Sequence, residues 1–352
     1  MEEVKKYRSR NRRRLIVILI ALVIIAIFSI YSASVSTMDM TFMEAYNLIY
    51  KKLFDIPLTT HMERIKTIII FDYNMPRTVG AIAVGVSLAV CGAIMQSITR
   101  NPLTDSYTIG ISSAALLGVT IAMAQGICVI PGLLGNDAYV VNAFVFALIP
   151  SAAIVFVSTF KKMSPTMMIL IGIGIMYLFN AMATFLKFNA SEETLQQIYE
   201  WGVGTLSMVD WDATYTMVAG ACLVFAVGMI FANSINVMGA GDSMAKALGV
   251  RPIFTRVLCF VVISISTGAC VAFTGTIGFV GLVGPHVARL LVGSNNKILI
   301  PTSAVIGALL ILGADIIVRV LPGGLPVGVI TAIIGSPIFL YILYKQKKNT
   351  GF

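Results

Sequence analysis

The chain has 352 residues, of which 58% are hydrophobic and only 12% are charged, and its mean hydropathy is +0.91. Soluble domains carry about 25% charged residues, so this composition excludes an ordinary soluble protein and predicts an all-α integral membrane protein. A formal net charge of +9 would suit a nucleic-acid partner, but the distribution of the cations along the chain argues against one.

Apolar runs long enough to cross a bilayer follow one another along the whole chain. The first run follows a basic head, residues 1–14, and lacks the small-residue site of a cleaved signal peptide, so we expect it to be a retained helix. Residues 1–352 are therefore expected to form a single polytopic membrane domain. Ten spans are predicted, near 15–35, 77–98, 108–127, 140–160, 166–187, 213–233, 253–273, 277–292, 301–319 and 327–344.

An even number of spans places both chain ends on one side of the membrane, and the distribution of Lys and Arg indicates which side that is. With the N terminus inside, the inner segments carry most of the 25 Lys and Arg residues, and the outer segments carry most of the 16 acidic ones. Both termini are therefore predicted to be cytoplasmic. The excess positive charge is interpreted as a topology signal, and no nucleic-acid partner is expected.

Two outer segments are longer than simple turns. Residues 36–76 contain an amphipathic stretch, Met43–Phe54, that is expected to lie along the membrane surface. Residues 188–212 are acidic and aromatic, and their two tryptophans are interpreted as interfacial anchors, with ligand contact as the alternative. A phosphate-binding loop of the GxxxxGK[ST] type is missing from the sequence, so the chain itself is not expected to hydrolyse ATP.

Residues 275–293, GTIGFVGLVGPHVARLLVG, begin with a glycine at every third position and continue with Pro285, His286 and Arg289. Glycines let helix backbones approach closely in lipid, and the donor that Pro285 removes is tolerated at membrane depth only inside protein. We therefore expect a short helix surrounded by protein. His286 and Arg289 are interpreted as structural, with a ligand or proton-relay role for His286 as the alternative. No metal site is predicted, and the five cysteines are interpreted as buried structural thiols.

Four motifs, in order along the chain, resemble those of FecCD-type permeases, the membrane subunits of type II ABC importers for iron–siderophore complexes, heme and cobalamin. The 275–293 stretch resembles the family's GxIGFxGLxxPHxxR signature. The other matching segments are 75–115 with MPRTVG and RNPL, 241–250 with GDSMAKALGV, and 309–345 with ADIIVR and LPVGVITAIIGSP. The resemblance implies a fold of ten transmembrane helices and an inverted repeat. An offset of 179 residues relates Arg77 to Arg256, Ser87 to Ser266 and Cys91 to Cys270, and is a weak trace of such a repeat.

The resemblance also implies partners: a second permease subunit, identical or closely related, two separate ATPase subunits, an extracytoplasmic substrate-binding protein and membrane lipid. It implies no cofactor and no catalytic residues, so the chain is expected to be a permease and not an enzyme. An iron–siderophore complex is the leading cargo, with heme and cobalamin as alternatives. An ion-coupled secondary transporter is a remote alternative, because the predicted spans carry no acidic residue near their middle.

A gate at the cytoplasmic side is the first group of site residues that the resemblance implies. Prolines at both gate segments begin or end helices, so each segment is a helix terminus that can reorient. The path is expected to be lined partly by the fifth and tenth spans. The alternative is that the first segment is simply a turn before a helix. The gate residues are Asn101, Pro102 and Leu103 after the second span, and Ser164, Pro165 and Thr166 before the fifth.

The second group is the cytoplasmic coupling segment, 238–250. Asp242 stands at an N-cap-like position and Gly249 follows the helix-forming run, which predicts a short helix. Ala245 and Leu248 are expected to form an apolar edge for a groove on the ATPase, and a surface helix on the bilayer is the alternative. The coupling residues are Gly241, Asp242, Ala245, Leu248 and Gly249.

Arg77 and Arg319, at the outer ends of two spans, form the third group, and the resemblance implies that they dock the binding protein. The alternative is structural: Asp315 pairs with Arg319 four residues along the same helix, and carbonyl groups cap Arg77. Asn74 stands where relatives often carry a second arginine, which makes the expected dock weaker by one charge per subunit.

Overall fold

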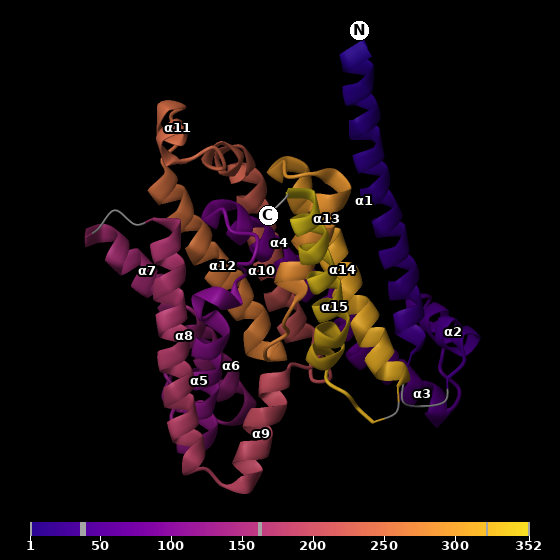
Figure 1. Cartoon of the computed structure of the whole chain (residues 1–352). Helices are drawn as coiled ribbons and strands as arrows, with labels where there is room; N and C mark the ends of the chain where they lie inside the picture. The colour runs from indigo at the N-terminus through magenta and orange to yellow at the C-terminus, as the bar shows by residue number, and fades with distance from the viewer. Residues whose placement is uncertain (1, 36–39, 161–163, 322, 351–352) are drawn as a thin grey trace.

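The computed structural model describes residues 2–35, 40–160, 164–321 and 323–350, and their regular elements are helices. Figure 1 shows the longer helices running side by side as a bundle, with shorter ones at its two ends. The elements are α1 (Glu2–Ser34), α2 (Phe42–Leu53), α3 (His61–Ile68), η1 (Ile69–Asn74), α4 (Met75–Thr99), η2 (Tyr107–Ile109), α5 (Ile111–Gln125), α6 (Gly135–Ala147), α7 (Ile149–Phe160), α8 (Pro165–Phe188), α9 (Glu192–Val203), α10 (Trp211–Met238), α11 (Asp242–Ala247), α12 (Pro252–Thr274), α13 (Val280–Val292), α14 (Asn296–Val320) and α15 (Val327–Thr350). The side chains of residues 1–12 in the basic head, and the loop 161–163, lie outside the described part.

Within the described part of the chain, seven helical stretches are long and apolar enough to cross a membrane, and three shorter apolar helices accompany them. Each of the ten predicted spans overlaps one of these stretches. The long ones are Arg13–Ser34, His61–Thr99, Gly135–Ser158, Pro165–Phe188, Trp211–Met238, Pro252–Thr274 and Asn296–Val320, and the shorter ones are Ile111–Gln125, Val280–Val292 and Val327–Ile342. The all-helical membrane fold is thus confirmed, and the number of crossings stays a prediction.

The centre of the bundle is α4, which packs against α10, α12, α13 and α14. Glycines allow these contacts, because a Cβ on Gly85 would overlap the backbone of Gly307 in α14, and a Cβ on Gly92 would overlap that of Gly281 in α13. Close backbone approach of this kind holds helices together where lipid supplies no hydrophobic drive. The buried α4 is therefore the scaffold of the bundle, and it positions the segments that precede and follow it.

Residues related by the offset of 179 meet where α4 crosses α12. The hydroxyl groups of Ser87 and Ser266 lie 2.6 Å apart, and both side chains are fully buried. Residues related by a two-fold axis can touch each other only beside that axis, so the contact supports the inverted repeat. Cys91 and Cys270 form the second pair at this offset. Arg77 and Arg256 form the third pair, and each of them lies in the first turns of its helix and binds an aspartate.

The predicted second span begins earlier than expected, because α3, η1 and α4 form one continuous helix from His61 to Thr99. Its middle part, η1, is a π-helix in which the Met75 N–H donates to Ile70 O, five residues back. Pro76 has no N–H, so the carbonyl of Phe71 lacks its partner in the π-helical pattern. The indole N–H of Trp211 donates to that carbonyl at 2.9 Å. This tryptophan thus satisfies an orphaned backbone group between α3 and α4.

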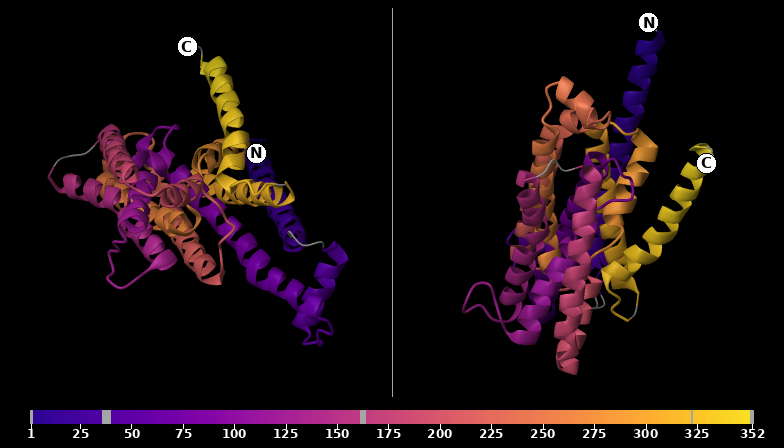
Figure 2. Two further views of the ribbon diagram at one scale, coloured as in Figure 1. Left: turned by 90° about the horizontal axis from the view of Figure 1, so that it is seen from below. Right: turned by 60° about the vertical axis from the view of Figure 1, so that its left-hand side comes forward.

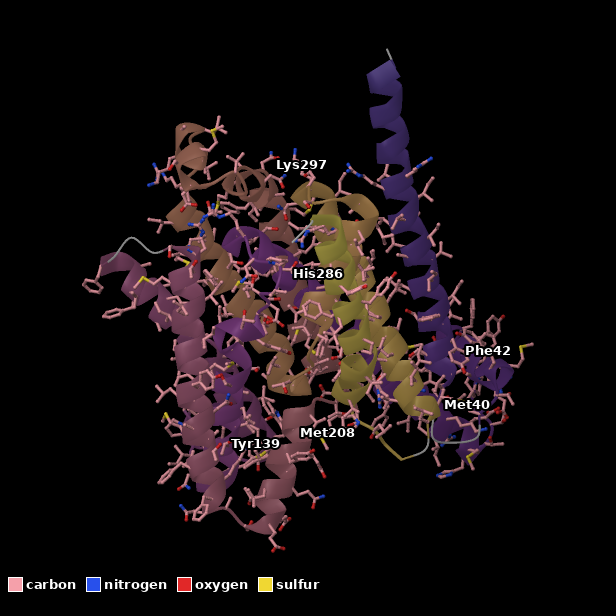
Figure 3. The ribbon with its side chains drawn as sticks, viewed as in Figure 1. Met40, Phe42, Tyr139, Met208, His286 and Lys297 are labelled. Carbon is pink, nitrogen blue, oxygen red and sulfur yellow. The ribbon has the colours of Figure 1, made fainter. Side chains whose placement is uncertain are left out.

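The glycine-rich stretch forms the expected short helix, α13, surrounded by protein along most of its length. Phe279 precedes it in the left-handed region, with φ of 69°. Pro285 cannot donate to Gly281 O, and the side-chain amide of Gln96 lies 3.4 Å from that carbonyl instead. His286 is buried and its Nδ1 lies 2.7 Å from Leu282 O, which supports the structural interpretation. Figure 3 shows His286 inside the bundle.

The amphipathic outer stretch forms α2, which begins with a capping box between Thr41 and Glu44. The α2–α3 hairpin is closed by two ion pairs, Lys51–Glu63 at 2.6 Å and Lys66–Glu44 at 3.1 Å. In Figure 1 the hairpin lies beside the end of α1 that is opposite the N terminus, and the left view of Figure 2 shows it standing out to one side of the bundle. Its position at a membrane surface stays a prediction. Among the cysteines, the expectation of burial fails for Cys222, which is exposed on α10, and holds only in part for Cys128, which is half-buried.

Candidate functional site

The first gate segment follows the buried scaffold helix directly. α4 ends at Arg100, which adopts the left-handed conformation with φ of 54° and turns the chain out of the helix. Asn101 Oδ1 then accepts the Leu103 N–H at 2.9 Å, and Asn101 O accepts the Thr104 hydroxyl at 2.8 Å. Pro102 stands between them, and the side chain of Leu103 is 48% exposed. The segment is a tight, hydrogen-bonded turn with an apolar side chain at its tip.

The second gate segment begins α8. The Ser164 hydroxyl caps the helix by accepting the Met167 N–H at 3.2 Å, and Pro165 occupies the first helical position, where its missing donor costs nothing. Pro165 is buried, whereas Ser164 and Thr166 are exposed. This segment is thus a well-defined helix start.

A cavity of about 360 Å³ lies between the first gate segment and α8. Gly172 lets α8 approach closely enough to form it, because a Cβ at that position would lie 2.5 Å from the Ile109 Cα. The lining residues are Asn101, Leu103, Thr104 and Thr108 on one side and Ile169, Ile173, Met176 and Tyr177 on the other. The structure therefore brings the first gate segment and the fifth span together. Residues of α15 and of 164–166 do not line this cavity.

The loop behind the gate segment holds a buried carboxylate. Asp105 Oδ1 accepts the Tyr107 N–H at 3.1 Å and the Thr108 N–H at 3.0 Å, which fixes the start of η2. Burial raises the pKa of Asp105 to about 6, because the charged form loses its hydration there, and the two backbone donors offset only part of that loss. The gate loop thus contains a group that changes charge near neutral pH.

The coupling segment folds into the predicted short helix, α11, but two details differ from expectation. Gly241, with φ of 110°, is the N-cap residue, so Asp242 is the first helical residue and caps nothing. The carboxylate of Asp242 instead accepts two hydrogen bonds from Arg256, at 2.5 and 2.7 Å. These bonds from Arg256 are the main reason that the pKa of Asp242 lies below its usual value.

The C-terminal end of α11 lies where Gly249 predicted it. Gly249 has φ of 79°, its N–H donates to Lys246 O at 3.0 Å, and the Val250 N–H donates to Ala245 O at 2.9 Å. These two bonds form a Schellman motif, which only a residue tolerant of the left-handed conformation can close.

The apolar edge of α11 differs from the predicted one. The Ala245 side chain is fully buried in the main apolar core of this chain, so it cannot enter a groove on another protein. Met244 and Leu248 are 55% and 63% exposed and form the outward apolar edge in its place. The reason is the clamp on Asp242, which turns that face of the helix inward. Figure 1 shows α11 at the same end of the molecule as the N terminus.

The two arginines of the proposed dock meet at one aspartate. Asp315 is fully buried, and its two oxygens lie 2.7 Å from Arg77 Nε and 2.7 Å from a terminal nitrogen of Arg319. The Arg319 contact is a close ion pair without the angle of a hydrogen bond. Arg319 also donates to the carbonyls of Ser32, at 3.0 Å, and Val35, at 3.3 Å, which ties the end of α1 to α14.

These contacts bear on the two interpretations of the arginines. The predicted pairing of Asp315 with Arg319 is confirmed, whereas Arg77 binds Asp315 rather than the carbonyls expected to cap it. The side chains of Arg77 and Arg319 are only 15% and 7% exposed. The neighbouring Asn74 stands where relatives often carry a second arginine. Its side chain is buried, and its amide donates to Ala33 O at 3.0 Å. Sequence reasoning missed this link between α1 and η1.

Elsewhere the described residues offer no grouping of three His, Cys, Asp or Glu side chains around one point. A second cavity, of about 20 Å³, lies among α13, α14 and α15 and has room for about one water molecule. The 360 Å³ cavity beside the gate segment is therefore the candidate site for passage of a ligand.

Comparisons with known proteins match almost the whole chain. The FecCD transport family matches residues 13–345. A Halobacterium salinarum protein named as a cobalamin import system permease is 35% identical, over 82% of this chain and 76% of its own length. A Helicobacter pylori protein assigned to iron chelatin transport is 34% identical, over 80% of this chain and 84% of its own length.

A solved structure, titled as an inward-facing conformation of a metal-chelate type ABC transporter, superimposes with a TM-score of 0.80. It is 27% identical in sequence and covers 93% of this chain and 98% of its own. Family, relatives and fold each match at least 80% of this chain. The protein belongs to the FecCD transport family and is a membrane-spanning permease of the metal-chelate type of ABC importer.

Proposed function

We propose that this chain forms the translocation path of an ATP-driven importer for an iron–siderophore complex. The observation that supports it most is the position of the cavity: its wall includes Asn101 and Leu103, and the adjacent Arg100 lies beside α11. A gate and an exposed apolar helix thus share one end of the bundle. An importer driven by a separate ATPase needs this combination, whereas a carrier without partners does not.

The proposed assembly contains two permease subunits, identical or closely related, and two ATPase subunits that dock on Met244 and Leu248 of α11. A binding protein delivers the cargo from the opposite side, and ATP hydrolysis is left to the ATPase subunits. Both termini lie on the cytoplasmic side of the cell membrane in this proposal. Its support is the grouping of the N terminus, α11 and Lys297 at one end of the bundle, as Figures 1 and 3 show.

Docking of the binding protein by Arg77 and Arg319 stays a prediction. The burial of both side chains around Asp315 supports the structural alternative, in which the arginines brace α1, α4 and α14. A docking role would use the exposed part of Arg77, and it would be sensitive to salt because rim charges are screened.

The α2 helix is proposed to lie along the outer membrane surface. Its exposed face carries Phe42, Met43, Tyr50, Leu53 and Phe54, and Figure 3 shows Phe42 at the edge of the molecule. Spin labels at Met43→Cys and Lys52→Cys test this, because these two exposed positions lie on opposite sides of the helix: the first should be shielded from a water-soluble relaxation agent and the second should not. Equal accessibility at the two positions would contradict the proposal.

The cargo is tested by reconstituting the permease with its ATPase and binding protein in liposomes. ATP-dependent uptake of a ferric hydroxamate labelled with ⁵⁵Fe is expected, with uptake of hemin and of cobalamin measured in parallel. Heme and then cobalamin are the alternatives, and relatives named for hemin and for cobalamin transport are 34% and 35% identical. Uptake of hemin or cobalamin alone would overturn the siderophore assignment and leave the importer proposal standing.

The same liposomes test the remote alternative of a secondary transporter. The purified permease without ATPase subunits should transport none of the three compounds under a proton or sodium gradient. Gradient-driven uptake by the permease alone would overturn the importer proposal.

A further inference from the structure

Arg256 joins three elements at the cytoplasmic end of the bundle. Its side chain is fully buried near the start of α12. Its Nε donates to Ile98 O, in the last turn of α4, at 3.0 Å, and its two terminal nitrogens donate to the Asp242 carboxylate at 2.5 and 2.7 Å. Bidentate pairs between arginine and carboxylate fix orientation as well as distance. Arg256 therefore holds α11 in a defined position against the end of α4.

Asp242 also faces a second arginine. Arg100 approaches its Oδ1 to 4.0 Å, and a Cβ on Gly241 would lie 3.7 Å from Arg100 Nη1. Arg100 is 42% exposed, in contrast to Arg256, and it is the left-handed residue immediately before the gate segment. Lys246 on α11 is the remaining cation that acts on this carboxylate. The carboxylate thus has a rigid buried partner and a looser exposed partner.

The two partners belong to different parts of the mechanism. Arg256 and Ile98 O connect Asp242 to the bundle, and Arg100 connects it to the turn that presents Leu103 to the cavity. Asp242 and Leu103 are far apart in sequence, so movement of α11 reaches the gate turn through the contacts of Asp242 with Arg256 and Arg100 at the end of α4. A displacement of α11 must either move the end of α4 and the gate turn or separate these charges.

We propose that Asp242, held between Arg256 and Arg100, is the positioning residue that transmits movement of α11 to the gate turn. The inference rests on the proposed function, in which an ATPase docks on α11. It adds a specific route: Arg256 makes α11 and the α4 end one rigid unit, and Arg100 makes the gate turn follow it. The competing account is that these contacts only stabilise the local fold.

The test uses the assembled complex of permease and ATPase subunits in nanodiscs, with a reporter at Leu103→Cys. The accessible Cys222 and the half-buried Cys128 are first replaced by serine, so that the reporter is the reactive thiol. The rate at which a membrane-impermeant maleimide labels position 103 is measured with and without Mg-ATP and vanadate. The ratio of the two rates is the gate response, which a purely structural role of the contacts would not change.

The variants Arg100→Gln and Asp242→Asn are expected to reduce the gate response at least fivefold, while the ATPase subunits still co-purify with the Arg100→Gln permease. Asp242→Glu keeps the carboxylate and should retain most of the response. Arg251→Gln is the matched control, since Arg251 is an exposed arginine at the start of the same helix as Arg256. Its gate response should equal that of the reporter protein without further substitution.

An unchanged gate response in Arg100→Gln would overturn the proposal, even if Asp242→Asn failed to fold, because Arg100 is 42% exposed and its replacement is expected to leave the fold intact. An equal loss in Arg251→Gln would also overturn it, since removal of any positive charge from this surface would then have the same effect. Failure of the proposed function is recognised separately. In that case the complex without these substitutions either does not retain the ATPase subunits or shows no gate response to nucleotide.

Discussion

Replacing Asp315 by asparagine tests whether Arg77 and Arg319 serve the fold. Asparagine keeps the shape of the side chain but removes the charge between two arginines, at a position with no exposed surface. Breaking a buried ion pair by removing one partner costs about 3–5 kcal/mol, because the remaining charge stays buried without compensation. A typical domain is stable by only about 5–15 kcal/mol, so this loss is a large part of the total.

We therefore expect Asp315→Asn to lower the free energy of unfolding by about 3–5 kcal/mol, measured in mixed micelles from tryptophan fluorescence. Arg77→Gln should cost less, because its side chain is 15% exposed and the Asp315–Arg319 pair remains. Arg64→Gln, at an exposed arginine of α3, is the control and should leave stability unchanged. Binding-protein association should decline only as far as folding does.

Two results would refute this reasoning. A loss below about 1 kcal/mol for Asp315→Asn would show that the pair is solvated or replaceable. Alternatively, Arg77→Glu with unchanged stability but weakened association, most strongly at low salt, would establish the docking role.

Three other predictions concern the end of the bundle that carries the gate segments and α11. Cysteines at position 103 in both permease subunits should crosslink in the closed state and block uptake, and failure to crosslink under any nucleotide condition would move the gate elsewhere. Leu248→Glu should abolish co-purification of the ATPase subunits with the folded permease. Ala245→Glu should instead reduce the yield of folded protein, because Ala245 is buried. If Ala245→Glu folded normally but lost the ATPase subunits while Leu248→Glu retained them, Ala245 would belong to the contact edge. Burial raises the pKa of Asp105 to about 6, so the folded state binds the proton more tightly than the unfolded state. Stability should fall by about 3 kcal/mol as pH rises from 4 through 6, and a pH titration of Asp105→Asn should lack that step.

The sequence was informative where a signal is local. Runs of apolar residues predicted the spans, and the proline within glycine-rich residues 275–293 predicted a short, buried α13. The four-residue spacing of Asp315 and Arg319 predicted their ion pair, because such residues share a helix face. Gly249 predicted the end of α11, since few residues accept the conformation required there.

Contacts between distant segments left no comparable signal. The burial of Ala245 follows from the Asp242–Arg256 clamp, and the partner of Arg77 is on another helix. One clue was available for the clamp: Arg256 stands within a predicted apolar span, so it needs a carboxylate, and Asp242 is the acidic residue of the preceding inner loop. The π-helix had a weaker clue in Pro76, whose missing donor disrupts the turn before it.

The π-helical η1 also sets the rotational phase between α3 and α4. A π segment arises when an α-helix carries one extra residue, and each residue of an α-helix turns the chain by about 100°. Deleting one residue from Ile69–Asn74 would restore a uniform α-helix and rotate the α2–α3 hairpin by about that angle around the helix axis. Trp211 would then lose the carbonyl that it binds, and the aromatic face of α2 would point elsewhere. The direction in which this hairpin faces is thus encoded by the length of the segment, so a family member one residue shorter here would present a different outer surface on the same bundle.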